Sequence, residues 1–439
     1  MVLEAIWISL YWMTPLRENS ALFVALMLVA FAIAIGCFLM IPLHHRHSLA
    51  IMLGFGLVFR LTVLPAHPDQ SEDVYRYLWD ARVAAHGLDP YAHPPDAPEL
   101  AGVRQTPIYD RLNSKPYITA YPPLSQALFR AARTVFGERV VPIKAVFALL
   151  EFCSLLIAWR LLAAFGQRLE PLYLMAWNPF FIFEFSHSGH SDSSAMFLVL
   201  MCVWLIHRRQ RSWAGAAYAG AVLSKLHPAL WFPMLLRAAG WRAFLAGTVT
   251  GCLLLAFYFS PSSLLAYVTS LQAYVRVFEF NGSVYNLARF FVQKYASQPW
   301  GVPVGSLLAI ILLGIAVIVC VRTPVRSGLD VLRASFWIMT ADLCLATTVH
   351  PWYLSWAAVS LFVFPYAFMA WWTGAVFLSY LAYAYRPVHE ATWVLLVEYV
   401  PVYALMAWEV IRGRPLLPDL LERTSRRDGV STEKSSGSG

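Results

Sequence analysis

Long runs of apolar residues constrain this chain more than any other feature. Residues 21–43 contain no charged side chain, and a helix needs about 20 apolar residues to cross a bilayer. Similar runs recur through the sequence. Only 13% of the 439 residues are charged, whereas soluble domains contain roughly 25%. The sequence therefore predicts an all-α polytopic membrane protein, with residues 1–439 forming a single integral membrane domain.

The apolar runs predict about a dozen transmembrane helices. The first covers residues 21–43, and the second ends at Pro65. Further spans are expected at 142–163, 171–186, 192–206, 213–236, 243–259, 302–321, 334–349, 351–367, 371–385 and 395–411. Residues 1–18 are short and aromatic, and they can form an interfacial helix.

Basic loops give these spans an orientation. Residues 207–211 read His-Arg-Arg-Gln-Arg, and such compact basic loops are typical of the cytoplasmic side. Arg322 with Arg326, and a tail at 412–439 that we expect to be disordered, agree with this side. Counting back places residues 67–140 outside as one large loop, because loops longer than about 60 residues do not follow the charge rule. We therefore attribute the net charge of +8 to cytoplasmic loops and expect no nucleic-acid binding.

The segment 213–236 cannot be one straight span. A straight helix would put Lys225 near the bilayer midplane, at a cost of about 2.5–3.5 kcal/mol. Pro228 follows and interrupts helices. We therefore predict that the chain reaches the outer side at residues 225–228 and returns.

Two amphipathic helices are expected in the large loop. The first lies in the stretch that begins at residues 67–80, where helical spacing puts Asp73, Arg76, Tyr77 and Asp80 on one face and Val74, Leu78, Ala81 and Ala85 on the opposite face. Its apolar side would contact lipid or protein, and its charged side a cavity. The second begins after Tyr121-Pro-Pro and ends at Gly137, since Pro favours a first turn and Gly follows helix ends.

Polar clusters collect on the outer side in this topology. They are residues 69–80, 187–192, Lys225 with His227, Asn281, 350–353, and Arg386 with His389. Each alone has a structural explanation, such as a helix cap, a turn or an aromatic belt at the interface. Together they indicate a polar cavity, and ionisable residues within a membrane protein usually serve function.

Metal and cofactor chemistry finds little support in the sequence. A metal site could form at His187, His190 and Asp192, where the three-residue spacing can present two ligands on one helical turn, but the sequence fixes no third or fourth ligand. We therefore assign no metal and no cofactor. The six cysteines lie in apolar runs without ligand spacing, so we expect packing thiols.

Several short motifs, taken in order, resemble a known enzyme superfamily. They lie at residues 72–82, 87–91, 121–123, 178–179, 188–192, 224–225 and 350–353. Their order is similar to that in GT-C glycosyltransferases, which use a polyprenyl-phosphate sugar, and most closely resembles the bacterial mannosyltransferase-like branch. The family pattern has Gly before the arginine that follows Trp-Asp, whereas this chain has Ala81 there.

The resemblance implies a GT-C-like bundle and a membrane glycosyltransferase of the cell envelope. It would move mannose, or another hexose or pentose, from a polyprenyl-phosphate donor to a lipid or glycan acceptor, with inversion. The implied place is a bacterial inner membrane, with the active site facing the periplasm or the exterior. Asp73 matches the acidic residue of the first outer loop that acts as general base.

The remaining polar residues receive roles from the chemistry of this reaction. A lipid phosphate carries growing negative charge as it leaves, so cations should contact it. Lys225, His227 and Arg386 are the candidates for phosphate binding. Candidates for sugar or acceptor binding are Asp69, Glu72, Arg76, Asp80, Arg82, Tyr121, His190, Asp192, Asn281, His350 and Tyr353. Aromatic residues at 350–353 could stack on sugar or isoprenoid.

A transporter or flippase of a lipid-linked sugar is the alternative. It would also need a polar cavity beside lipid. Such proteins often contain two related halves with matching broken helices, and this sequence shows no such repeat. A channel is a third class, but no filter motif is visible.

Overall fold

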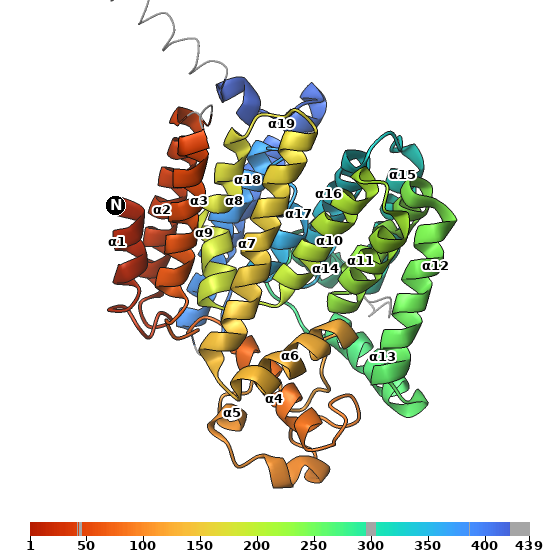
Figure 1. The fold of residues 1–439 in the computed structure, drawn as a ribbon. Coiled ribbons are helices and arrows are strands. Elements are labelled where there is room, and N and C mark those ends of the chain that lie inside the picture. Colours follow the sequence, from red (N-terminus) through yellow and green to blue (C-terminus); the bar gives the residue numbers. More distant parts are fainter. Residues whose placement is uncertain (42, 44–45, 296–303, 386, 422–439) are drawn as a thin grey trace, which may run out of the picture. The chain divides into compact units, whose positions relative to one another are not determined.

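The computed structural model describes residues 1–41, 43, 46–295, 304–385 and 387–421. These residues form helices and connecting turns, and the β structure among them is one isolated parallel bridge between Phe280 and Thr348 (Figure 1). The all-α prediction is confirmed. Six described helices are long and apolar enough to cross a membrane, or seven if a bent pair counts as one span. The protein is therefore a multi-pass membrane protein.

The structure gives fewer long spans than the dozen predicted. Residues 171–186 form short pieces, namely η2 (Glu170–Leu172), α8 (Tyr173–Ala176), α9 (Pro179–Phe181) and the π-helical turn η3 (Ile182–His187). Residues 351–367 contain only η5 (Pro351–Leu354) and α17 (Ser355–Ala358) before turns. Prolines interrupt both runs. Their apolar character reflects burial and not a continuous helix.

The chain divides into two compact units. The first comprises residues 1–63, 158–183 and 358–439. Its helices are α1 (Val2–Ser9), α2 (Ser20–Met40), α3 (Arg46–Val63), η2, α8, α9, α18 (Ala367–Ala375), η6 (Val376–Ala384) and α19 (Thr392–Arg412). Aromatic packing of Phe23 against Phe377 and Tyr380 joins α2 to η6. The buried Glu409 of α19 accepts the backbone N–H groups of Ala367 and Phe368 at the start of α18.

The second unit comprises residues 64–157 and 184–357. Its helices are α4 (Asp73–Ala85), η1 (Pro98–Val103), α5 (Pro107–Asp110), α6 (Pro123–Phe136), part of α7 (Val140–Ala164), α10 (Asp192–His207), α11 (Arg211–Ser224), η4 (His227–Trp231), α12 (Phe232–Tyr258), α13 (Pro261–Val277), α14 (Ser283–Tyr295), α15 (Val304–Arg322), α16 (Gly328–Leu345) and η5. Every candidate residue within the described chain lies in this unit.

The predicted helix break at Lys225 is confirmed. Helix α11 ends at Ser224, and Lys225 has extended backbone angles. A second break follows at Gly240, whose φ of 73° and ψ of −170° are not helical. Beyond it, α12 passes so close to α11 that a Cβ on Gly215 would lie 1.9 Å from the Ala243 carbonyl oxygen. The apolar stretch 227–258 is therefore two helices joined by a reversal.

The helices of unit 2 place the polar clusters at one end of the unit and the basic turns at the other. Helices α10 and α11 run antiparallel through the short turn at 208–210, so Asp192 and Lys225 come to one end. The other end holds that basic turn, and Gly328 at the start of α16 lies against the carbonyl of Val203 in α10. The basic turns and the polar clusters are thus separated, as the sequence predicts.

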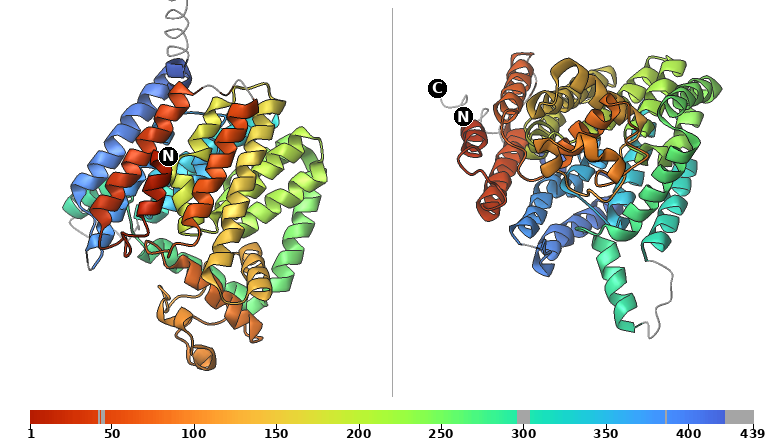
Figure 2. Two further views of the ribbon diagram at one scale, coloured as in Figure 1. Left: turned by 60° about the vertical axis from the view of Figure 1, so that its left-hand side comes forward. Right: turned by 90° about the horizontal axis from the view of Figure 1, so that it is seen from below.

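The large loop contains both expected helices. Helix α6 has Pro123 in its first turn and Gly137 as a C-cap with φ of 72°. Helix α4 begins at Asp73, and Figure 2 shows these short helices together at one end of unit 2. Helix α4 differs from the interfacial helix we expect. Val74, Leu78 and Ala81 are each 1% exposed. The charged Arg76 and Asp80 are 4% and 1% exposed, because α6 and the segment 117–121 cover them.

Candidate active site

Asp73 combines burial with access from outside the chain. It opens α4, where the positive end of the helix dipole favours a carboxylate, and its side chain is 20% exposed. Its Oδ2 lies 3.6 Å from Nδ1 of His190, an ion-pair distance and longer than a hydrogen bond. Its Oδ1 accepts a 3.4 Å hydrogen bond from Nδ2 of Asn113. One carboxylate oxygen thus faces the protein interior.

Neighbouring polar groups keep this carboxylate ionised. Burial alone would raise the pKa of Asp73, but interactions with His190, His350 and Lys225 outweigh burial and lower the pKa to about 2. Asp73 is therefore negatively charged at any physiological pH. A carboxylate in this state can accept a proton from a hydroxyl group.

The turn before α10 holds His190 against Asp73. Gly189 has φ of +77°, and a Cβ there would lie 2.5 Å from Cγ of Lys144, so this turn needs glycine. His190 is fully buried, and its Nε2 lies 3.5 Å from Oε2 of the equally buried Glu184. A carboxylate therefore lies beside each ring nitrogen of His190.

Lys225 and Asp192 form an ion pair at the ends of their helices. Nζ of Lys225 lies 3.0 Å from Oδ2 of Asp192 and 5.2 Å above the ring of Tyr121. The other oxygen of Asp192 accepts a 2.8 Å hydrogen bond from the Trp356 indole. The lysine side chain is 15% exposed, whereas the aspartate is fully buried. The lysine therefore brings a positive charge to the surface of this polar cluster.

Two indoles of residues 350–356 are covered on both faces. His190 and His350 stack on Trp352 with ring centroids at 3.7 and 4.5 Å. His227 and Tyr353 stack on Trp356 at 3.8 and 4.4 Å. Two rings parallel to one indole at such distances cannot share one of its faces. The expectation that Trp352 stacks on sugar or isoprenoid is therefore wrong, because protein rings occupy both of its faces.

Backbone pairing places Phe280, which precedes Asn281 in the chain, beside His350. The N–H of Phe280 donates to the Thr347 carbonyl, and the N–H of Val349 donates to the Phe280 carbonyl at 2.7 Å. Phe280 also stacks on His350, with ring centroids 5.0 Å apart. Asn281 is buried and has φ of 52°, an angle that asparagine tolerates better than most residues.

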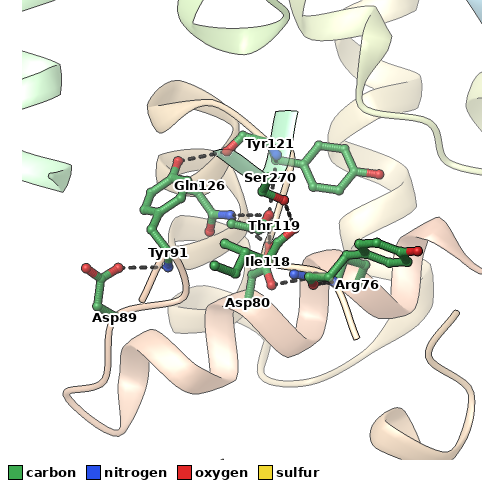
Figure 3. A network of polar contacts seen from close by, with 10 residues as sticks. Arg76, Asp80, Asp89, Tyr91, Ile118, Thr119, Tyr121, Gln126 and Ser270 are labelled. Carbon is green, nitrogen blue, oxygen red and sulfur yellow. Dashed lines mark hydrogen bonds and ion pairs between the residues drawn. The ribbon is translucent and has the colours of Figure 1, made fainter. Parts of the chain in front are cut away.

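Arg76 and Asp80 hold the large loop together (Figure 3). Asp80 accepts hydrogen bonds from Arg76 Nε at 2.9 Å, Gln126 Nε2 at 2.8 Å and Thr119 Oγ1 at 2.5 Å. Arg76 also donates to the Tyr117 carbonyl. Asp80 is 1% exposed, so its contacts connect α4 to α6 and to the segment 117–121. This geometry supports a role in shaping the loop, and sugar binding by Arg76 and Asp80 stays a prediction.

Other predicted residues lie apart from Asp73 or in local contacts. Asp69 pairs with His67 at 2.5 Å. Glu72 is the residue before α4, without a side-chain capping bond. Arg82 pairs with Glu138 at 2.9 Å near the other end of α4. Arg386 lies outside the described residues.

The sequence interpretation missed three residues of this cluster. Glu184 is an acid within the apolar run 179–185, a signal that points to function in membrane proteins. Trp356 lies four residues after Trp352, which is one helical turn. Asn113 has no local signal, because its contact with Asp73 depends on how the loop folds.

A protein-family model agrees with the resemblance that the sequence motifs show. Among the described residues, no group of three His, Cys, Asp or Glu side chains is arranged to hold a metal ion. No curated protein and no solved structure matches the chain. The model of the MptA_B family, described as alpha-(1->6)-mannopyranosyltransferase, N-terminal domain, matches residues 3–240, more than half of the chain. This chain, a multi-pass membrane glycosyltransferase, therefore belongs to that family of mannosyltransferases.

Proposed function

We propose that the protein transfers mannose from a polyprenyl-phosphate donor to a glycan or lipid acceptor, with Asp73 as general base. The acceptor hydroxyl oxygen bonds to the anomeric carbon while the bond from that carbon to the phosphate oxygen breaks. The electron pair stays on the phosphate, and the hydroxyl proton passes to Asp73. A single displacement of this kind inverts the anomeric centre.

The observation that carries this proposal is the setting of Asp73. Its carboxylate is partly exposed and ionised, and its surroundings are cationic or hydrogen-bonding groups. A general base must be within hydrogen-bonding reach of its proton donor. Of the acids near His190, Asp73 is 20% exposed whereas Glu184 and Asp192 are fully buried. Asp73 is therefore the carboxylate we assign to the acceptor.

The leaving phosphate needs positive charge or N–H donors nearby. Lys225 and His350 both interact electrostatically with Asp73. Burial lowers the pKa of His350 to about 4, although Asp73 opposes this shift, so at neutral pH its ring is an uncharged donor and acceptor. We assign the phosphate charge to Lys225 and a hydrogen bond to His350, with His227 as a further contact.

The donor assignment follows from the side of the membrane that we propose for the site. The polar cluster lies at the end of unit 2 opposite its basic turns, and basic turns favour the cytoplasm. The proposed active site then faces outward, where nucleotide sugars are absent and a lipid-linked sugar is accessible. Membership in a mannosyltransferase family gives no support to a transporter.

The test is transfer by the purified protein from radiolabelled polyprenyl-phosphate mannose. We expect Asp73→Asn to lower turnover by about 10²–10⁴-fold, the usual contribution of a general base, with donor binding retained. Asp110→Asn is a matched control, since Asp110 is an exposed acid of the same loop. Near-normal turnover of Asp73→Asn would exclude Asp73 as the base.

The donor is tested separately in the same assay. Wild-type protein receives polyprenyl-phosphate mannose in one reaction and nucleotide-linked mannose in another. Product from the lipid donor alone is the expected result. Product from the nucleotide donor alone would overturn the donor assignment and the outward-facing site, while leaving the mannosyltransferase activity intact.

A further inference from the structure

His190 lies between two carboxylates on opposite sides of its ring. Nδ1 is 3.6 Å from Oδ2 of Asp73, and Nε2 is 3.5 Å from Oε2 of Glu184. Stacking on Trp352, at a centroid distance of 3.7 Å, fixes the plane of the ring. The ring therefore has one orientation, with a different acid at each nitrogen.

The three groups differ in their access to a substrate. The Asp73 side chain is 20% exposed, while His190 and Glu184 have no exposed surface. A substrate can touch Asp73 but cannot reach the two residues behind it. His190 and Glu184 can thus act on the reaction only through Asp73.

The backbone around Glu184 is specialised for this contact. Glu184 belongs to the π-helical turn η3, and such turns are rare and occur frequently at functional sites. The backbone N–H of His190 donates to the Glu184 carbonyl at 3.1 Å. This bond closes the loop that carries Gly189 and sets the side chains of Glu184 and His190 together.

We propose that Glu184 and His190 are positioning residues for Asp73, in which Glu184 holds the His190 ring and the ring holds Oδ2 of Asp73. The inference rests on Asp73 being the base. Oδ1 of Asp73 then remains directed away from His190, towards the acceptor hydroxyl. Each ring nitrogen of a histidine can donate a hydrogen bond when it carries a proton, so an acid at each nitrogen can hold the ring in place between Glu184 and Asp73.

Replacement of the Glu184 carboxyl should change the pH dependence of the reaction. The charged or polar groups facing Asp73 are His190, His350, Lys225 and Asn113, and the phenol of Tyr77 is also nearby. Without the Glu184 carboxyl, the His190 ring loses its contact at Nε2 and is held less firmly against Asp73, so burial of Asp73 is opposed more weakly. The pKa of Asp73 then rises. As the pH is lowered, activity should therefore begin to decline at a higher pH than in the wild type.

The experiment measures kcat, the donor KM and the pH profile of kcat/KM for Glu184→Gln and Glu184→Asp. We expect Glu184→Gln to lower kcat by about 10–100-fold, less than the ~10⁴-fold loss known for neutralising the acid that orients a catalytic histidine. KM should change by less than about 3-fold, because the substrate contacts remain. The wild-type profile should be flat from pH 5 to 7, whereas that of Glu184→Gln should decline towards pH 5. Glu184→Asp should restore part of kcat and the flat profile.

Two controls separate positioning from folding. Glu151→Gln removes another fully buried glutamate of unit 2, on α7, and should leave the pH profile unchanged. Thermal unfolding of each variant in detergent reports its stability. If Glu184→Gln is less stable but keeps wild-type kcat and a flat profile, its role is only structural and the inference is overturned.

The Asp73→Asn variant distinguishes this inference from the proposed function. An active Asp73→Asn would refute the base itself. An inactive Asp73→Asn together with a wild-type Glu184→Gln would refute only the positioning. In the double variant Asp73→Asn/Glu184→Gln, we expect no loss beyond that of Asp73→Asn alone, because residues that act through one another are not additive. Additive losses would contradict the inference.

Discussion

At the scale of single residues, the polar cluster is defined by partners that sequence separation hides. Lys225 is recognisable in the sequence because it follows an apolar helix and precedes a proline. Its pairing with Asp192 is a tertiary contact, 3.0 Å long, that no local pattern encodes. Asp73 could be predicted as a candidate base from its motif. The contact of Asn113 with Asp73 and that of Glu184 with His190 are also tertiary, so no local pattern predicts them. The sequence shows which residue types are present, whereas the residues that they contact are known only from the folded structure.

Lys225 should affect both stability and donor affinity, and two variants can separate these effects. Lys225→Ala leaves the buried Asp192 without its cation, which typically costs about 3–5 kcal/mol of folding free energy. It also removes the proposed phosphate contact, worth about 1.5–3 kcal/mol of donor binding. Lys225→Met/Asp192→Asn removes the buried charge as well. We expect thermal unfolding to show recovered stability in this double variant, while a lipid-binding assay shows donor affinity still reduced.

Full recovery of donor affinity in the double variant would contradict a role for Lys225 in phosphate binding. The pair would then serve folding alone. Loss of affinity without loss of stability in Lys225→Ala would instead show that Asp192 finds another partner.

At the scale of elements, the local sequence predicts where helices begin and end better than it predicts which apolar runs form continuous membrane-spanning helices. Pro123 and Gly137 delimit α6 as expected, and the chain breaks at Lys225. These features depend on a few neighbouring residues. The apolar runs 171–186 and 351–367 do not form continuous spans, because hydropathy reports burial whether or not the backbone is regular. In the large loop, Arg76 and Asp80 on the charged face of α4 are buried, and sequence periodicity cannot show this.

The turn that carries His190 should be intolerant of a Cβ at Gly189. Gly189→Ala meets both a positive φ of 77° and Cγ of Lys144 at 2.5 Å, whereas Gly87→Ala meets a φ of 76° in open space. Strained backbone alone costs about 1–3 kcal/mol. We therefore expect Gly189→Ala to lower the thermal unfolding temperature in detergent more than Gly87→Ala does, and to reduce transferase turnover. Equal effects of the two changes would show that contact with Lys144 is not limiting.

At the scale of the whole molecule, the number of membrane-spanning helices and the orientation of the chain in the membrane depend on different features of the sequence. Composition was sufficient for a multi-pass all-α protein, and family membership agrees with the motifs. The sequence predicts about a dozen spans, whereas six described helices, or seven if a bent pair counts as one span, are long and apolar enough to cross a membrane. Orientation depends on charge asymmetry between the two ends of unit 2, and the basic turns and the polar cluster do lie at opposite ends.

The orientation predicts opposite labelling at two exposed positions. In a variant whose six native cysteines are replaced, single cysteines at Glu99 in the large loop and at Gln210 in the basic turn are exposed to solvent. A membrane-impermeant thiol reagent, applied to cells with an intact inner membrane, should label position 99 and not position 210. Ser188 is unsuitable as a marker because it is 1% exposed. Labelling at 210 with protection at 99 would invert the orientation.

The interleaving of the two units along the chain also sets an order of biosynthesis. At about 5–20 residues per second, His350 leaves the ribosome roughly 14–55 s after Asp73. Lys225 follows Asp192 within a few seconds, so this pair can neutralise its charges almost as soon as α10 and α11 enter the membrane. The surroundings of Asp73 are completed only when residues 346–356 arrive. A nascent chain therefore contains the proposed base long before it contains the histidine that we assign to the phosphate, and on this proposal activity appears only near the end of synthesis.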